Sequence, residues 1–313
     1  MQTVEGRVVI EKLRATVQGS AAACHPGRRA LHLLTVVTVA TLVLAITRFE
    51  PSVVDAADPS LTVRTISLVA NDLVYAQSTG QIFASIPSTA GPQGNSLVPI
   101  DPATGSVGTG TFVGSEPSKL AISDDGQVIY VALDGAAAVR RFDVASRTAG
   151  VQFQVGSDSF FGPMLADDIA VQPGSHSVVA VSRRNQCCSP RHMGVAMYED
   201  GVQRTTTTPG HTGSNVIEFG IDPTRLYGNN TETSEYGFRR MDVSPSGVTT
   251  VDVTASLIPG SDFIVAGGRV YATSGVVVDP ELRQRLGQFT LGTFGSQVAA
   301  DPAHSRVYFL TNS

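Results

Sequence analysis

An internal repeat runs through most of this sequence. Six times, a short apolar segment is followed by a turn rich in Asp, Gly, Pro or Ser and then by a second apolar segment. An aromatic residue or a valine marks the second segment of each unit, and the markers are Phe83, Tyr130, Val179, Tyr227, Tyr271 and Tyr308. They recur about every 45 residues, a period that is typical of propeller blades.

Each of the first five units continues into a second hairpin, so that a unit contains four strands. The clearest example pairs Ala138–Val144 with Gly150–Val155. Four antiparallel strands in about 45 residues correspond to one blade of a β-propeller. A helical solenoid is excluded, because no segment between Leu61 and Ser313 sustains a period of 3.6 residues. We therefore predict an all-β fold, a β-propeller of four-stranded antiparallel blades.

The blade count is less regular. About six blades are visible, and the sixth unit reaches Ser313 without an outer hairpin. The segment Leu61–Leu68 is a candidate to supply an outer strand of that blade. A six-bladed ring with incomplete closure and a truncated seven-bladed ring are both compatible with the repeats. We favour the truncated ring, because a last strand without a partner leaves an unpaired edge.

The first 56 residues differ from the repeats and predict export. Arg28 and Arg29 precede an apolar run from Ala30 to Ile46, and small residues lie before a cleavage site after Ala56. This order is typical of a signal peptide, and the run is at the lower limit of what spans a bilayer. Residues 1–56 are thus predicted to be a signal peptide, or alternatively a retained membrane anchor, and residues 57–313 the propeller domain. The location would be periplasmic, cell-surface or secreted.

Charge and cysteine content limit the partners of the exported part. The whole chain has a formal net charge of −5, and residues 57–313 carry 16 Lys and Arg against 23 Asp and Glu, a net charge of −7. We expect no nucleic-acid partner, and membrane contact only through an uncleaved N-terminal segment. The adjacent Cys187 and Cys188 are compatible with a vicinal disulfide, free thiols or pairing between chains.

Several segments resemble the YVTN repeat. Its first half, a Val-Tyr-Val-Thr-Asn strand, is matched by Val307–Ser313 and by Ile129–Ala132, and its second half, Ile-Asp followed by an Ala-Thr-Gly turn, by Ile100–Gly105 and Phe142–Thr148. The resemblance implies the YVTN and lactonase-like β-propeller superfamily, which contains bacterial extracytoplasmic proteins and 6-phosphogluconolactonases. No lactonase catalytic motif can be carried over to residues of this chain, and fold alone does not give function.

The candidate site lies on loops of units three and four. In a propeller, the loops after each second strand and the loops between blades lie on one face. On that face we predict a cluster that recognises an anionic group, because arginine and histidine donors on adjacent loops suit carboxylate or phosphate. The predicted ligand-binding residues are Arg183, Arg184, Arg191, His192, His211, Asn215 and Glu232. The alternative is that Asp167, Asp168 and Glu232 neutralise the arginines in structural ion pairs.

Two functions are compatible with these observations. The first is a non-catalytic extracytoplasmic propeller whose loop face binds a protein, a glycan or a small anionic ligand, without catalytic residues, metal or cofactor. The alternative is a lactonase-like hydrolase that acts on a sugar lactone, with acidic loop residues activating water. We favour the first.

Overall fold

The computed structural model describes residues 8–9, 65–292 and 295–311. Apart from Val8 and Val9, the predicted signal segment lies outside these residues, including the apolar run Ala30–Ile46. Within the described residues, no helix combines the length and the hydropathy needed to cross a bilayer.

The described residues contain five antiparallel four-stranded sheets, and each is one blade. Blade one is β2 (Asp72–Ala76), β3 (Gln81–Ile86), β4 (Ser96–Ile100) and β5 (Thr111–Phe112). Blade two is β6 (Pro117–Ile122), β7 (Val128–Leu133), β8 (Ala138–Asp143) and β9 (Thr148–Gln154). Blade three is β12 (Leu165–Val171), β13 (Val178–Arg184), β14 (His192–Glu199) and β15 (Val202–Gln203). Blade four is β16 (Val216–Phe219), β17 (Arg225–Asn229), β18 (Gly237–Ser244) and β19 (Gly247–Ala255). Blade five is β20 (Phe263–Ala266), β21 (Arg269–Ala272), β22 (Val276–Asp279) and β23 (Gln284–Gln288).

Blade six is smaller. It contains β24 (Gly295–Asp301) and β25 (Arg306–Thr311), and the two-residue strand β1 (Val8–Val9) pairs antiparallel with β25. The remaining elements are the short hairpin β10 (Ser157–Asp158) with β11 (Gly162–Pro163) and three 3₁₀ turns, η1 (Ser88–Gln93), η2 (Asp134–Ala136) and η3 (Pro302–His304).

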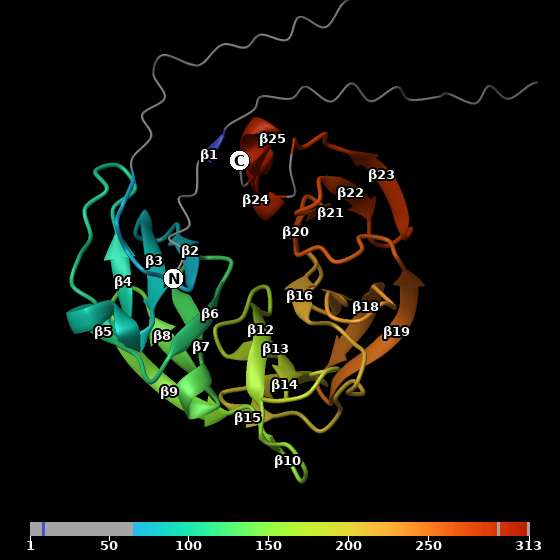
Figure 1. Ribbon diagram of the computed structural model, residues 1–313, viewed down its shortest axis with the longest axis horizontal. Helices are drawn as coiled ribbons and strands as arrows, with labels where there is room; N and C mark the ends of the chain where they lie inside the picture. Colours follow the sequence, from blue (N-terminus) through green and yellow to red (C-terminus); the bar gives the residue numbers. More distant parts are fainter. Residues whose placement is uncertain (1–7, 10–64, 293–294, 312–313) are drawn as a thin grey trace, which may run out of the picture. The chain divides into compact units, whose positions relative to one another are not determined.

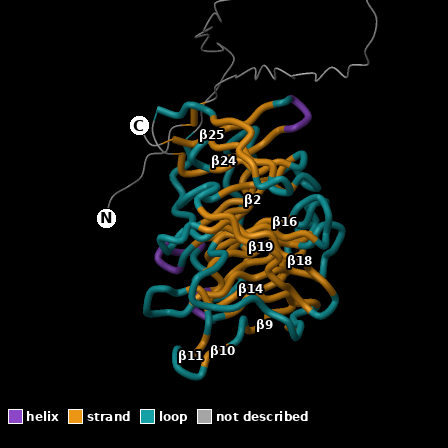
Figure 2. Tube along the Cα trace, turned by 90° about the vertical axis from the view of Figure 1, so that its right-hand side faces the viewer, coloured by secondary structure: helices purple, strands orange, loops and turns teal. Residues whose placement is uncertain are grey.

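The blades follow one another around a ring, with the first strand of each blade toward the centre and the last toward the outside (Figure 1). Seen from the side, the strands form the middle of the ring and the loops cover its two faces (Figure 2). The predicted all-β propeller is confirmed, and the hairpins predicted within the six units are present among the described residues.

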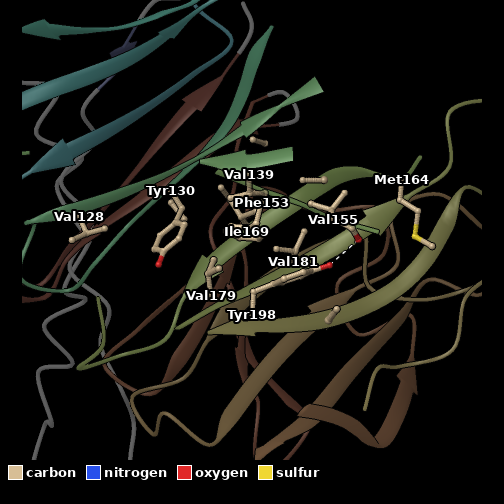
Figure 3. Close-up of a cluster of buried hydrophobic side chains, with 14 residues drawn as sticks. Val128, Tyr130, Val139, Phe153, Val155, Met164, Ile169, Val179, Val181 and Tyr198 are labelled. Carbon is tan, nitrogen blue, oxygen red and sulfur yellow. Dashed lines mark hydrogen bonds between the residues drawn. The ribbon is translucent and has the colours of Figure 1, made fainter. Parts of the chain in front are cut away.

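The hydrophobic core lies between blades. Successive residues of β7 point in opposite directions: Val128 and Tyr130 pack toward blade three, whereas Ile129 and Val131 pack toward blade one. Figure 3 shows the cluster between blades two and three, in which the Tyr198 hydroxyl donates to the Val155 carbonyl oxygen at 2.7 Å. Burying an apolar side chain of this size contributes about 1.5–3 kcal/mol. Alternate side chains of one strand therefore contribute to the interfaces with the preceding and the following blade.

The predicted role of Leu61–Leu68 in the last blade is wrong for the described part of that segment. Residues 65–70 form no strand, and Ile66 and Leu68 pack against the buried cluster of β3 and β4 in blade one. Their apolar side chains are partly buried there, so the described residues of this segment add no strand to blade six. On the edge of β25 that faces away from β24, the described partner is instead β1, whose residues belong to the segment predicted to be removed on export.

Candidate functional site

The predicted site residues come from blades three and four. Arg183 and Arg184 end β13, Arg191 ends the following loop, and His192 begins β14. The other three lie outside strands: His211 and Asn215 in the connection to blade four, and Glu232 between β17 and β18.

The loop that precedes Arg191 is organised by Asn185. Its side chain is buried, and its Oδ1 accepts from the backbone N–H groups of Cys187 and Cys188, both at 2.9 Å. Its Nδ2 donates to the carbonyl oxygen of Cys188 at 3.2 Å. Cys187 and Cys188 form a vicinal disulfide, which is one of the three alternatives left open by the sequence. The amide and the disulfide together fix the loop that ends at Arg191.

A polar network links blades two, three and four at the loops that carry the predicted site. The Arg184 guanidinium pairs with Asp134 of blade two at 2.9 Å and with Asp167 of blade three at 3.3 Å. Asn215 Nδ2 then donates to Asp167 Oδ2 at 3.1 Å. Burial raises the pKa of Asp167, against the opposing effects of Asn215 and Arg184. Arg184 is therefore shared between two carboxylates.

Arg191 and Glu232 complete this network. The Glu232 carboxylate accepts from the Arg191 backbone N–H and from its Nε, both at 3.0 Å, and Asn215 Nδ2 approaches Glu232 Oε2 at 3.4 Å. Burial opposes ionisation of Glu232, but these Arg191 donors outweigh it and lower the pKa of the carboxyl below its ordinary value. The Arg191 side chain remains 42% exposed, so part of the guanidinium faces solvent.

Three predicted residues are buried. Asn215, whose amide belongs to the network, is 6% exposed, and the other two lie inside blade three. Arg183 is 6% exposed and donates to the Gly194 carbonyl oxygen at 3.3 Å and to Gln203 Oε1 at 3.4 Å. His192 is 1% exposed, and neither ring nitrogen has a hydrogen-bond partner among the described residues. Burial lowers the pKa of His192 to about 4, and the nearby arginines add to this effect. These two side chains are thus less accessible to a ligand than the sequence predicts.

His211 is the exposed member of the set. Its backbone N–H donates to the His192 carbonyl oxygen at 2.8 Å, and its φ is 81°. Gly213, two residues later, leaves space for the His192 ring: a Cβ at this position would lie 2.1 Å from two ring atoms. The path of the 211–215 connection is therefore fitted to the buried imidazole.

A second group of charged residues lies on the first strands of the blades, at the inner side of the ring. Its members are Asp72 of β2, Lys119 of β6, Asp168 of β12, Glu218 of β16, and Asp262 immediately before β20. We call them the inner charged group. All five are half-buried, and each interacts electrostatically with at least one of the others. They therefore share one confined region that solvent still reaches.

The inner charged group has strongly shifted ionisation. Burial raises the pKa of Asp168 to about 8, opposed by Lys119 and reinforced by Asp262. Burial also raises the pKa of Glu218 to about 8, and Asp168 and Asp262 raise it further. The enclosure of these two carboxyl groups and their mutual repulsion therefore favour the protonated form over what an exposed carboxyl group would show. Strong shifts of this kind are characteristic of functional sites.

The sequence indicates Asp168 only as an ion-pair partner of the arginines, and the other four members of this group are not among the predicted site residues. A signal was present, because in five successive repeats a charged residue precedes or interrupts the first apolar strand. First strands of blades are the most enclosed, so a charge there is costly unless it has partners or a function. Within the described residues, no group of three or more His, Cys, Asp or Glu side chains is arranged to hold a metal ion.

Comparisons with known proteins support the fold. Neither a family model nor a curated protein matches the sequence. Among solved structures, the hydrazine synthase of Kuenenia stuttgartiensis is similar, with a TM-score of 0.59, 14% identity, and coverage of 80% of this chain and 76% of that one. The β-propeller domain of Swd1 from Myceliophteria thermophila has a TM-score of 0.50 and 13% identity over 69% of this chain and 66% of its own. At such low identity the likeness shows a β-propeller, the type of scaffold on which loops carry binding sites.

Proposed function

We propose that this chain is a non-catalytic extracytoplasmic β-propeller that binds a hydroxyl- and carboxylate-bearing ligand, such as a sugar acid or an acidic glycan, on the loop face of blades three and four. The observation that carries this proposal is the polar network that joins Asp134, Arg184, Asp167, Asn215, Glu232 and Arg191 across three blades.

Stability alone does not account for this network. Partly exposed ion pairs contribute only about 0–1 kcal/mol each. The loop before Arg191 is in addition held by a disulfide and a buried amide. A binding role gives a reason for placing guanidinium, carboxylate and amide groups side by side at fixed positions.

The charges of the network determine the class of ligand. Because Arg184 and Arg191 already have carboxylate partners, a simple anion has to compete with Asp134, Asp167 and Glu232. A sugar acid avoids much of this competition. Its hydroxyl groups donate to the carboxylates, while its own carboxylate accepts from the exposed part of Arg191.

An extracytoplasmic location is supported by two features. Arg28 and Arg29 precede the apolar run that ends at Ile46. The vicinal disulfide between Cys187 and Cys188 suits an oxidising compartment. N-terminal sequencing of protein recovered outside the cytoplasm tests this part of the proposal: a chain that begins after Ala56 supports export with cleavage, and an intact Met1 in the cytosol contradicts it.

The ligand is tested by calorimetry with glucuronate and galacturonate oligosaccharides and with the matching neutral oligosaccharides. We expect binding of the acidic sugars only, and a loss of about tenfold or more in affinity for Arg191→Ala. Arg283→Ala is the matched control, because the Arg283 side chain lies between β22 and β23 of blade five, is 46% exposed and pairs with one carboxylate, that of Asp252 in β19. Equal loss in both variants, or binding of neutral sugars alone, contradicts the proposed site.

The inner charged group favours a second candidate function, a lactonase-like hydrolase. A carboxyl group with a pKa near 8, as found for Asp168 and Glu218, suits a general acid at neutral pH. The test is hydrolysis of a panel of sugar lactones by the parent protein and by Glu218→Gln. Turnover that disappears in Glu218→Gln but persists in Glu199→Gln, a variant of the exposed residue at the end of β14, supports this alternative over the binding protein.

A further inference from the structure

The hairpin of β10 and β11 projects from the connection between blades two and three. Its two strands pair Ser157 with Pro163 and Asp158 with Gly162. Both views show it extending beyond the adjacent blades, at the lower edge of the ring (Figures 1 and 2). Its tip is therefore available for contact with another molecule.

Two aromatic residues occupy this tip. Phe160 is 84% exposed, and its ring lies 4.9 Å from that of Phe161 in an edge-to-face arrangement. Asp158 Oδ1 accepts from the backbone N–H groups of Phe160 at 2.8 Å and Phe161 at 3.0 Å. These hydrogen bonds fix the turn while the Phe160 ring remains exposed to solvent. An exposed apolar surface on a structured element is a candidate interaction site.

The apolar surface continues onto the loop that carries the disulfide. The side-chain amide of Gln186 donates to the Pro163 carbonyl oxygen at 2.8 Å, which joins this loop to the hairpin. Cys187 and Cys188 follow directly and are exposed. Their disulfide replaces two weakly polar thiols by a rigid apolar group. We define the blade-three apolar surface as Phe160, Phe161, Pro163, Cys187 and Cys188.

The charge of the hairpin is acidic. Asp158 lies beside the two phenylalanines, and the sequence contains no lysine or arginine between Thr148 and Ser182. Two backbone N–H groups at the hairpin tip lower the pKa of Asp158, so this exposed carboxylate stays ionised over a wide pH range. The nearest arginines on the adjoining loop are paired with Asp134, Asp167 and Glu232.

We propose that the blade-three apolar surface docks a segment of a partner protein that carries apolar and basic side chains together. The apolar side chains would cover the Phe160 ring and the disulfide, and an arginine or lysine would pair with Asp158. The hairpin carries the Asp158 carboxylate and no lysine or arginine, so it is poorly suited to anionic lipid headgroups. Two copies of this surface would bring like charges together, which disfavours self-association through it.

This proposal does not depend on the sugar-acid site. It is tested on the full chain by fluorescence anisotropy with a labelled peptide of three Arg-Phe-Ser-Gly repeats. Two further peptides replace either every Arg by Glu or every Phe by Ser. We expect saturable binding of the first peptide and at least about fivefold weaker binding of the other two.

The variants identify the surface. Phe160→Ser should weaken binding of the Arg-Phe peptide about tenfold, and Asp158→Asn, which keeps an acceptor for the turn, should weaken it about two- to threefold and reduce its salt dependence. Phe112→Ser in β5 is the matched control, because Phe112 is 63% exposed on blade one. Equal melting temperatures for the three variants verify that folding is unchanged.

Several results would overturn the proposal. No binding of the Arg-Phe peptide, equal binding of the Glu peptide, or equal losses in Phe160→Ser and Phe112→Ser would each contradict the assignment. Co-sedimentation with vesicles of phosphatidylcholine and phosphatidylglycerol that requires Phe160 would assign the surface to lipid instead. A dimer in analytical ultracentrifugation that Phe160→Ser dissociates would assign it to a second copy of the chain.

Discussion

Asp168 of blade three accepts a hydrogen bond from the backbone N–H of Ile217 in blade four, at 2.7 Å. The same contact recurs between blades one and two, where Asp72 accepts from the N–H of Leu120 at 2.9 Å. A buried serine on the neighbouring strand accompanies each aspartate: Ser182 donates to the Ser214 carbonyl oxygen, and Ser85 to that of Ser118. The inner strands of these blades are therefore joined by hydrogen bonds as well as by apolar packing.

The contact between Asp72 and Leu120 is expected to stabilise the fold measurably. Asp72→Ala leaves the Leu120 N–H without its acceptor and should lower the free energy of unfolding by about 1.5–3 kcal/mol. Asp72→Asn retains an oxygen acceptor and should lose clearly less. Chemical denaturation of the three proteins at neutral pH measures both differences, and equal losses in the two variants would show that the hydrogen bond is not the cause.

Glu218 should make the protein less stable in alkali. Burial and the neighbouring carboxylates raise the pKa of Glu218 in the folded protein to about 8, whereas the ordinary value is about 4.3. The folded state therefore retains a proton that the unfolded state has lost. The stabilisation that the protonated Glu218 gives to the folded state is present in full below about pH 4 and is lost as the pH rises through 8. Glu218→Gln should remove this decline, which amounts to on the order of a few kcal/mol. Denaturation at pH 5 and pH 9 provides the comparison.

His192 should have the opposite effect. Burial and nearby arginines lower the pKa of His192 to about 4. Between about pH 4 and pH 6.5 the imidazole is therefore protonated in the unfolded state and neutral in the folded state. The stabilisation that the neutral His192 gives to the folded state is present above about pH 6.5. It is lost as the pH falls toward 4, which lowers the free energy of unfolding by up to about 3 kcal/mol. His192→Gln should flatten this part of the pH profile. A profile that keeps the same slope in the variant would assign acid sensitivity to other groups.

Gly213 is expected to tolerate no side chain while His192 is present. A Cβ at Gly213 would lie 2.1 Å from the imidazole, so Gly213→Ala should destabilise the protein by about 1–3 kcal/mol. In a double-mutant cycle, His192→Ala should recover part of this loss, because it removes the clashing ring. Additive losses in the double variant would mean that Gly213 is required by its backbone and not by its neighbour.

The fold followed from the sequence because its repeat and its strand alternation are local signals. Markers such as Tyr130 and Tyr227 lie on second strands, as predicted. The candidate site was predicted less completely, because enclosure depends on packing between blades. Arg183 and His192 look like loop residues in the sequence, but their side chains are buried. Conversely, Glu218 looks like an ordinary polar position, and only the ring brings it near Asp168 and Asp262.

The placement of the core between blades has a consequence for dividing or permuting this protein. A cut in the turn before β6 or β12 separates sheets along the chain, yet it exposes two apolar faces that had covered each other, such as those of Tyr130 and Val179. The unit that packs together is thus formed by the two sheet faces that meet between adjacent blades. Each sheet contributes one face to each of two such units, so a unit does not coincide with one sequence repeat. A fragment that consists of whole repeats would expose an apolar sheet face at each end. A circular permutant that keeps all adjacent blades in contact would retain every interface between blades.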